Sequence, residues 1–440
     1  MARLKLASMT FTFIAPRLLA ALLCCLSLAP ARALEATWSG FATLGYARSD
    51  SAYTYQRFIH QDGSFKRDSL LAGQLDLRLS PQWSATVQAK LAPANDSDQG
   101  LRATAAWAFV AWRPDNDWLL RAGKVRLPIY LYSESLDIGV ASDMVRLPHE
   151  MYSTVPTNDF TGIFATRSFN GSQRDVSLDA FSGQADATAR LWIRDGLPPV
   201  LPAGPLFKTV QVKVNGLALT ARDSTLTWRV ALLSSRTTPV DGPRLPVRFA
   251  RVDLAPGLGY WQVGDSLPGP GVERVSRIRN LALTAGAEWQ FGDGWRLAGE
   301  AVRMRQRDTE LGSDSKAGYI ALFKRVGSFT PYVSAARQRS SDGVLGWHQR
   351  LTTPTLPAFV PGAAQINAAQ RVAGESGYAF DQRSLALGLS YALSPTAKLK
   401  GEWMRTQVGQ ASGHFDVPAG QPDAQGLRVH TLSAGLSLGF

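Results

Sequence analysis

The sequence has very few cysteines, and both lie near its N-terminus. Cys24 and Cys25 are the only two in 440 residues, and they lie within an apolar run, "LLAALLCCLSLAP". Basic residues precede this run, and Ala31-Arg32-Ala33 follows it with the small-x-small pattern of a cleavage site. We therefore expect residues 1–33 to be a secretory signal peptide. The mature chain, 34–440, would then have no disulfide, no thiol nucleophile and no cysteine metal site.

Long apolar runs and catalytic motifs are missing as well. No later stretch approaches ~18 uninterrupted apolar residues, so we expect no transmembrane helix. The formal net charge is +12, but Lys and Arg form no block of the kind that binds nucleic acid. There is no HExxH, GxSxG or Walker motif, and His60 near Asp62 and His149 beside Glu150 are the only acid–base neighbours. The sequence therefore predicts no enzyme, no metal site and no cofactor.

What the chain does have is a period of two. Between residues 70 and 92, apolar residues such as Leu75 and Val87 alternate with polar ones such as Asp76 and Gln88, on both sides of a short turn at 80–82. This pattern indicates a β-hairpin. Each arm is about ten residues long, whereas soluble strands average about five or six. Ten residues is roughly what a tilted strand needs to cross a bilayer.

The hairpin unit recurs along the whole mature chain. Short turns are expected at 80–82, 114–117, 170–173, 222–224, 292–294, 326–328 and 394–396. Longer connections lie at 49–67, 93–101, 127–159, 184–208, 237–275, 308–314, 340–381 and 409–425. With a first strand at 37–48 and a last at 427–440, the count is sixteen.

This arrangement predicts an all-β fold: a 16-stranded antiparallel transmembrane β-barrel, 34–440, with short periplasmic turns and long extracellular loops. The strands close on one another because an open sheet edge in hydrocarbon leaves backbone groups without hydrogen bonds. A soluble sandwich would have shorter strands, and a propeller would show a repeat of four strands at fixed spacing. We find neither.

In such a barrel the apolar face points to lipid and the polar face lines a lumen. The residues assigned to the lumen on this basis include Arg78, Lys90, Lys213 and Arg229. Lumenal cations bias a pore toward anions, but a lumen whose arginines pair with local acids is an equally good interpretation. Arg303, Arg305 and Arg307 share one face of a strand, which indicates either a bulge or an approach to the polar outer rim.

The third long connection, about 127–159, is rich in apolar and aromatic residues for a loop. A loop exposed to water would be more polar, so we expect it to fold into the barrel and narrow the lumen. Its charged residues would then meet Lys124 and Arg126 at the constriction; these are Glu134, Asp137, Asp143, Arg146, His149 and Glu150. A lid on top of the barrel, or a latch onto a neighbouring subunit, is the alternative.

One short run carries a family resemblance. "LLRAGKVRLPIYLYSES" resembles the strand-to-loop transition of the phosphate-selective porin O/P group, through Arg121, Gly123, Lys124, Arg126 and Pro128. The sixteen-strand layout is also similar to that of the general trimeric porins. The resemblance implies a homotrimeric diffusion pore in the Gram-negative outer membrane. It does not imply phosphate selectivity, because the third loop carries acids as well as cations.

The sequence therefore predicts an outer-membrane porin that passes small hydrophilic solutes, with a weak anion preference. A substrate-specific channel is the alternative, and an adhesin or an outer-membrane enzyme is less favoured. The expected partners are outer-membrane lipid, lipopolysaccharide and the outer-membrane assembly machinery. The final stretch, "HTLSAGLSLGF", alternates perfectly, and its terminal aromatic, Phe440, resembles the signal that this machinery recognises.

Overall fold

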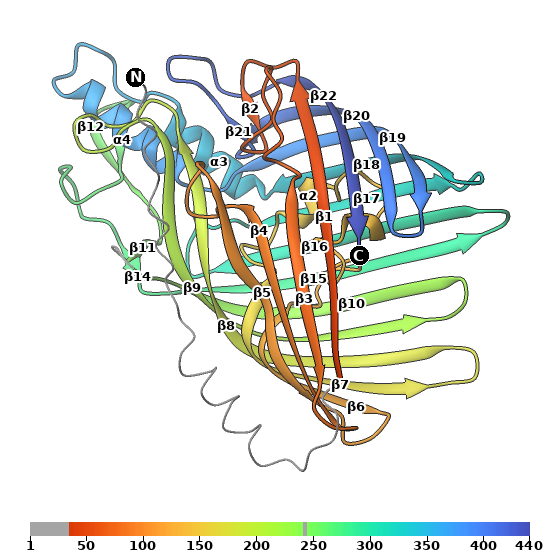
Figure 1. Cartoon of the computed structure of the whole chain (residues 1–440). Helices are drawn as coiled ribbons and strands as arrows, with labels where there is room; N and C mark the ends of the chain where they lie inside the picture. Colours follow the sequence, from red (N-terminus) through yellow and green to blue (C-terminus); the bar gives the residue numbers. More distant parts are fainter. Residues whose placement is uncertain (1–34, 241–243) are drawn as a thin grey trace, which may run out of the picture.

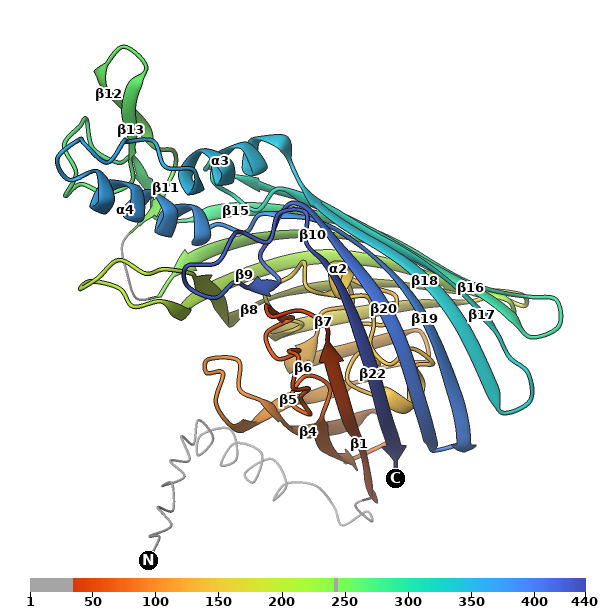
Figure 2. The ribbon, with the colours of Figure 1, turned by 90° about the horizontal axis from the view of Figure 1, so that it is seen from above.

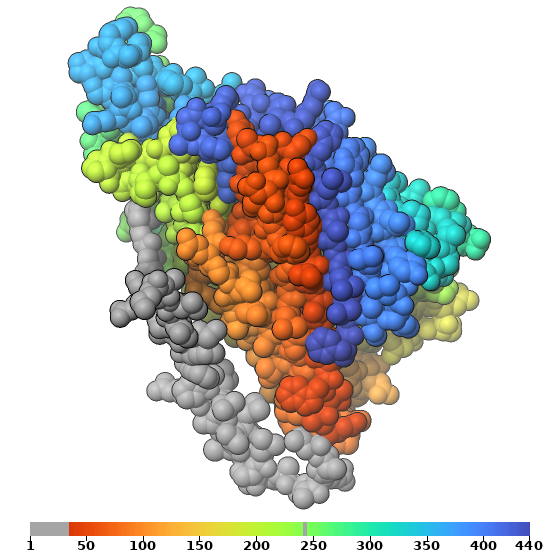
Figure 3. All heavy atoms as spheres, turned by 45° about the horizontal axis from the view of Figure 1, so that its top comes forward, coloured from red at the N-terminus to blue at the C-terminus, as the bar shows by residue number. Residues whose placement is uncertain are grey.

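The computed structural model describes residues 35–240 and 244–440, so the expected signal peptide lies outside the described residues. The main body is one closed antiparallel barrel of sixteen strands, in the order β1-β22-β20-β19-β18-β17-β16-β15-β10-β9-β8-β7-β6-β5-β4-β3. The first and last strands pair directly, with Leu44 opposite Leu436, and they lie next to each other in Figure 3. The predicted fold and strand count are confirmed.

Most strands of the barrel fall where the alternating pattern predicts them, but the connection expected at 184–208 is shorter, because one strand continues to Ile193 and the next begins at Gly204. Their bounds are β1 (Glu35–Ser49), β3 (Leu70–Arg78), β4 (Trp83–Pro93), β5 (Leu101–Trp112), β6 (Trp118–Arg126), β7 (Asp159–Asn170), β8 (Asp175–Ile193) and β9 (Gly204–Arg222). The remainder are β10 (Leu226–Pro239), β15 (Ile278–Phe291), β16 (Trp295–Arg307), β17 (Ser315–Lys324), β18 (Phe329–Ser340), β19 (Phe380–Ser394), β20 (Ala397–Ser412) and β22 (Arg428–Gly439).

The connections differ in length at the two ends of the barrel. Tight turns gather at one end, which we call the short-turn end, and the long connections gather at the other, the long-loop end (Figures 1 and 2). At the long-loop end β2 (Thr54–Tyr55) pairs with β21 (Phe415–Asp416), and β11 (Leu245–Pro246) pairs with β14 (Arg274–Val275). A hairpin of β12 (Ala250–Ala255) and β13 (Leu258–Gln262) projects there as well.

Two helices also lie at the long-loop end, within a connection that the sequence predicted only as a loop. They are α3 (Asp342–Thr352) and α4 (Ala363–Glu375). The Ser341 side chain caps α3 by accepting from the Val344 amide. Trp347 on α3 packs edge-on against Trp261 of β13, with ring centroids 5.0 Å apart. The connections 244–275 and 340–381 therefore form one packed unit. In the described part of the chain, no helix is long and apolar enough to span a bilayer.

The outer face of the barrel is apolar, as expected of a wall in lipid. Leu432 is 59% exposed and Ile163 is 65% exposed, although both lie in the middle of strands. A soluble monomer rarely exposes apolar patches larger than a few hundred Å². At the short-turn end Trp83, Trp118 and Trp295 are exposed in the same way. This band of leucines flanked by aromatics is typical of a transmembrane barrel.

The last residue takes part in closing the barrel. The Phe440 amide donates to the carbonyl of Gly40 at 2.9 Å, and the Gly40 amide donates to the carbonyl of Phe440 at 2.7 Å. The Phe440 ring is 72% exposed and lies over Gly40, where a Cβ would come within 2.4 Å of a ring carbon. A side chain at position 40 would therefore displace this ring.

Candidate functional site

The interior of the barrel is crossed by residues 127–158, which we call the constriction segment. It leaves the wall after β6 and returns at β7, and it contains a turn of 3-10 helix, η1 (Gly139–Ala141), and α2 (His149–Tyr152). Ile129, Tyr130, Met144 and Met151 are almost fully buried, and they form one apolar cluster with wall residues such as Val302. The segment therefore packs inside the barrel, where Figure 1 shows α2.

One ionic anchor joins the start of the segment to the wall. Asp137 accepts from Lys90 of β4 at 2.9 Å and from Arg126 of β6 at 2.8 Å. Arg126 also pairs with Asp159 at 2.7 Å. Burial alone would raise the pKa of Asp137, but the two cations outweigh it and hold that pKa below its usual value. The carboxylate stays ionised and bridges two strands.

A second anchor lies at η1 and the residues after it. Asp143 pairs with Arg296 of β16 at 2.6 Å and with Lys398 of β20 at 2.7 Å. The Lys400 ammonium donates to the backbone carbonyls of Gly139 at 2.6 Å and Met144 at 3.0 Å. The segment is therefore also tied to strands far around the barrel from β4.

Glu300 on β16 holds a third point of the segment. One carboxylate oxygen accepts from the Leu131 amide at 2.7 Å. The other accepts from the hydroxyl of Tyr319 at 2.9 Å and from that of Tyr152. Glu300 is only 5% exposed, so water does not replace these donors when they are lost.

Arg229 of β10 completes this side of the lumen. Its guanidinium donates to the carbonyl of Tyr130 at 2.7 Å, and a further nitrogen lies 3.5 Å from the Glu134 carboxylate. In the barrel, β15 lies between β16 and β10. The segment therefore contacts a continuous part of the wall here.

The end of the segment is fixed by Arg146 and His149. Arg146 pairs with Asp68, from the connection before β3, at 2.7 Å. The Nδ1 atom of His149 lies 3.3 Å from an Arg67 nitrogen, and its ring centroid lies 4.4 Å from that of His414. Burial, followed by the neighbouring His414 imidazole and the Arg67 guanidinium, lowers the pKa of His149 well below its usual value. The imidazole is therefore neutral at neutral pH.

Several residues that the sequence assigned to the constriction lie elsewhere. Lys213 was expected in the lumen but lies on the exposed outer face, between Val212 and Val214, which face inward. The expectation is wrong because the 19-residue strand β9 is longer than the hydrocarbon layer requires. Its outer face therefore becomes polar toward the long-loop end. Arg78 lies at the short-turn end of β3, 3.6 Å from Glu35, and so outside the constriction.

The two cations of the "GKVR" run, Lys124 and Arg126, have different surroundings in the structure. Arg126 joins the anchor at Asp137. Lys124 forms no ion pair with any residue in the described ranges, and it does not line the large cavity inside the barrel. Arg121 points elsewhere, with its guanidinium 4.0 Å above the Phe164 ring. Gly123 between them has φ +131°, and a Cβ there would approach the Ala108 carbonyl to 2.3 Å. Only glycine fits this position.

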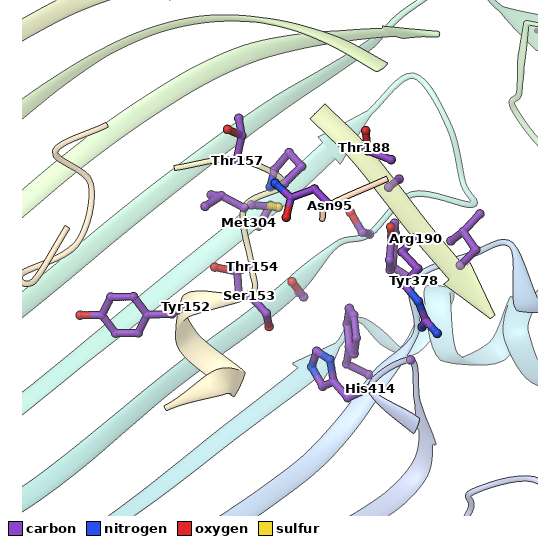
Figure 4. A pocket seen from close by; sticks show the side chains of 18 of the residues that line it. Asn95, Tyr152, Ser153, Thr154, Thr157, Thr188, Arg190, Met304, Tyr378 and His414 are labelled. Carbon is purple, nitrogen blue, oxygen red and sulfur yellow. The ribbon is translucent and has the colours of Figure 1, made fainter. Parts of the chain in front are cut away.

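A cavity of about 1020 Å³ lies between the constriction segment and the long-loop end. Figure 4 shows Thr154 and Thr157 of the segment together with Thr188, Arg190 and Tyr378 around it. One part of its wall is apolar; its residues there are Val210, Val212, Val214, Leu233, Ile278, Ala282 and Met304. Phe249, Trp347 and Leu351 extend this apolar lining into the unit formed by the long connections.

Charged residues line another part of the cavity wall. Arg190 of β8 bridges Asp98 at 2.8 Å and Asp416 at 2.7 Å, and Arg57 also reaches Asp98. Burial alone would raise the pKa of Asp98, but the hydrogen bonds from Arg190 and Arg57 hold it below its usual value. These charges are again paired rather than free.

Sequence reasoning missed Glu300, Arg296 and Asp68 as partners of the segment. The three arginines after Glu300 left the sidedness of β16 open, so Glu300 and Arg296 were not assigned to the lumen. Asp68 lies in a connection, where no periodic pattern indicates direction. Among the described residues, no group of three or more His, Cys, Asp or Glu side chains is placed to hold a metal ion.

No family model and no curated protein matches the chain. The resemblance to the phosphate-selective porin O/P group therefore gains no support. Solved structures share the fold. OmpT, an outer-membrane protein of Vibrio cholerae in its trimer form, is 11% identical with a TM-score of 0.52, covering 93% of this chain and 100% of that one.

Weaker likenesses include the outer-membrane channel DcaP of Acinetobacter baumannii, with 10% identity and a TM-score of 0.48, covering 92% of this chain and 97% of that one. An anion-selective porin from Comamonas acidovorans is 14% identical with a TM-score of 0.47, covering 92% of this chain and 100% of that one. At these identities the comparisons show the barrel fold and nothing finer.

Proposed function

We propose that the chain is an outer-membrane channel of the porin type, through which small hydrophilic solutes diffuse passively. The observation that carries the proposal is the closed barrel with an apolar outer face, narrowed by a segment tied to its inner wall. In this proposal the short turns face the periplasm, and the long loops face outward. The function is diffusion and has no catalytic step.

The proposed selectivity is at most a weak preference for anions. Lumenal cations attract anions into a pore, but Lys90, Arg126, Arg146, Arg296 and Lys398 are each paired with an acid. Ion pairs of this kind cancel most of the field that would select one sign. A strong selectivity would need free charge of one sign along the path.

The assembly that we propose is a homotrimer embedded in outer-membrane lipid and lipopolysaccharide and inserted by the outer-membrane assembly machinery. The support for a trimer is the sixteen-strand layout, which is similar to that of general trimeric porins. Native mass spectrometry of the purified protein tests it, and a monomer alone would contradict it.

Conductance in a planar lipid bilayer tests the channel itself. The purified mature protein is expected to give stepwise ion conductance, with a reversal potential in a salt gradient displaced only slightly toward anions. A folded barrel that gives no steady conductance would refute the proposal. Heat-modified migration on an unheated gel shows independently that the barrel is folded.

A substrate-specific channel is the second candidate, and the apolar side of the cavity favours it. A purely hydrophilic path has no use for Val210, Val212, Val214 and Leu233 facing its lumen. A solute with a charged head and an apolar tail would contact both this wall and the paired charges around Arg190.

Liposome swelling with straight-chain monocarboxylates, from acetate to octanoate, separates the two candidates. Simple diffusion predicts rates that fall steadily as the chain lengthens. A specific channel predicts a maximum at intermediate length, and Val212→Thr should reduce that maximum. A steady fall in both proteins would leave only the general channel.

A further inference from the structure

The outer wall has a hollow of about 750 Å³ over β17, β18, β19 and β20, strands that run side by side in Figure 2. The small residues Gly318 and Ala335 lie at its base, and Ile320 and Leu385 flank it. These residues alternate with Tyr319, Ala336 and Ala386, which are buried toward the interior. The hollow therefore opens to the surroundings of the barrel and not to its lumen.

Three arginines line the same hollow: Arg337 of β18, Arg383 of β19 and Arg405 of β20. Arg337 lies directly opposite Arg383 across the strand pair, and Arg405 lies opposite Leu385, two residues from Arg383. Like charges placed directly opposite each other destabilise a sheet. Their juxtaposition therefore calls for an anion between them.

These arginines have no acidic partner in the described part of the chain, residues 35–240 and 244–440. Arg383 donates to the side-chain oxygen of Gln407 at 2.8 Å, which leaves its charge uncompensated. In the lumen, by contrast, Arg126, Arg146 and Arg296 each pair with a carboxylate at 2.8 Å or less. The three arginines of the hollow therefore lack the carboxylate partners that these lumenal arginines have.

The arginines also lie at a defined level of the wall. Along the outer face of β19, the exposed residues Leu389, Leu387 and Leu385 are followed by Arg383 toward the long-loop end. The outer face of β16 changes in the same way from Ala301 to Arg303, Arg305 and Arg307. The ambiguous arginines of β16 therefore belong to the polar outer rim, and no bulge interrupts that strand. This level is where the hydrocarbon of a bilayer gives way to headgroups.

We infer that this hollow binds a lipid that carries phosphate groups on its headgroup, specifically a bis-phosphorylated glycolipid of the leaflet at the long-loop end. Guanidinium groups bind phosphate through two parallel hydrogen bonds, and three of them match two phosphates. The apolar flank formed by Ile320 and Leu385 receives an acyl chain below the headgroup. The inference rests on the proposed membrane location of the barrel.

The composition of the hollow favours a lipid over other anions. Free phosphate would use the arginines but not the apolar flank. A second copy of the chain would have to bring an acidic face, and the outer surface at this level carries cations on β10, β16 and β22 as well, namely Arg236, Arg303 and Arg428. An amphipathic anion alone uses both halves of the hollow.

Native mass spectrometry of the purified full barrel in detergent tests the site, with synthetic diglucosamine lipid A bearing two phosphates as the probe. The triple variant Arg337→Gln/Arg383→Gln/Arg405→Gln is expected to bind it about tenfold or more weakly, since charge-assisted contacts are lost. The matched control is Lys213→Gln/Arg236→Gln/Arg307→Gln. It removes three exposed outer cations on β9, β10 and β16, none of which lines the hollow, and should change the affinity less than about threefold.

A second variant tests the shape of the hollow without changing its charge. Ala335→Leu fills the base and leaves the three arginines in place, so it should weaken lipid A binding while inorganic pyrophosphate binds as before. Dephosphorylated lipid A should bind poorly to the unmodified protein.

Two outcomes would overturn the inference. They are undiminished lipid binding by the arginine variant and an equal loss of binding in the matched control. Bilayer conductance, measured on the same preparations, reports on the channel separately, so failure of the lipid site is distinguishable from failure of the proposed function.

Discussion

Substitution of Glu300 by Gln should release one side of the constriction segment. In the structure three donors, the Leu131 amide and the hydroxyls of Tyr152 and Tyr319, converge on the two oxygens of this carboxylate. A Gln side chain keeps the shape but replaces one oxygen with an NH₂ group, which is itself a donor. At least one of the three donors then faces another donor inside a buried site.

The magnitude follows from the kind of hydrogen bond that is lost. A bond to a charged acceptor contributes about 1.5–3 kcal/mol, and a buried donor left unpaired costs a similar amount. One lost bond therefore raises the population of the detached segment by roughly 10- to 150-fold, since about 1.4 kcal/mol is a factor of ten. Tyr319→Phe removes one donor and keeps the carboxylate, so it should have a smaller effect.

Hydrogen exchange of the Leu131 amide is the direct assay, because this amide donates to Glu300 and opens only when the segment detaches. Its protection should fall by the stated factor in Glu300→Gln, and open-channel current noise should increase in parallel. If Leu131 stays equally protected while the barrel remains folded, Glu300 does not hold the segment and the reasoning is refuted.

Three further perturbations test the site and the unit at the long-loop end. Asp137→Asn leaves Lys90 and Arg126 without their shared partner, so the reversal potential in a salt gradient should shift toward anions; an unchanged value would place this anchor outside the ion path. Lys213→Glu should leave that potential unchanged, because Lys213 lies on the outer face, and a shift would contradict its placement. Burial raises the pKa of Glu375, in α4, from 4.5 to about 7. Docking of α4 should therefore weaken as pH rises from about 4.5 to 7, because the docked state disfavours the ionised form. Protease cleavage within 353–379 should increase over that range, and Glu375→Gln should abolish the dependence.

The barrel was predictable because its signals are local. A strand with one face in lipid must alternate, and a short turn fixes the register of the two strands it joins, so each hairpin is specified within about 25 residues. The inward packing of 127–158 was predictable on similar grounds, since an apolar loop needs a surface to cover. In contrast, the sequence predicts only a long connection at 340–381, and the structure forms α3 and α4 there.

The sequence by itself determined the sixteen strands, their positions and the apolar outer face, since apolar and polar residues alternate along each strand. Only the tertiary structure decided which wall residues hold the constriction segment, because Glu300, Asp68 and Arg296 come from distant parts of the chain. It also decided the direction of Lys213 and of the β16 arginines. Alternation assigns two faces to a strand but does not say where the strand leaves the hydrocarbon, and beyond that level a polar residue is stable on either face.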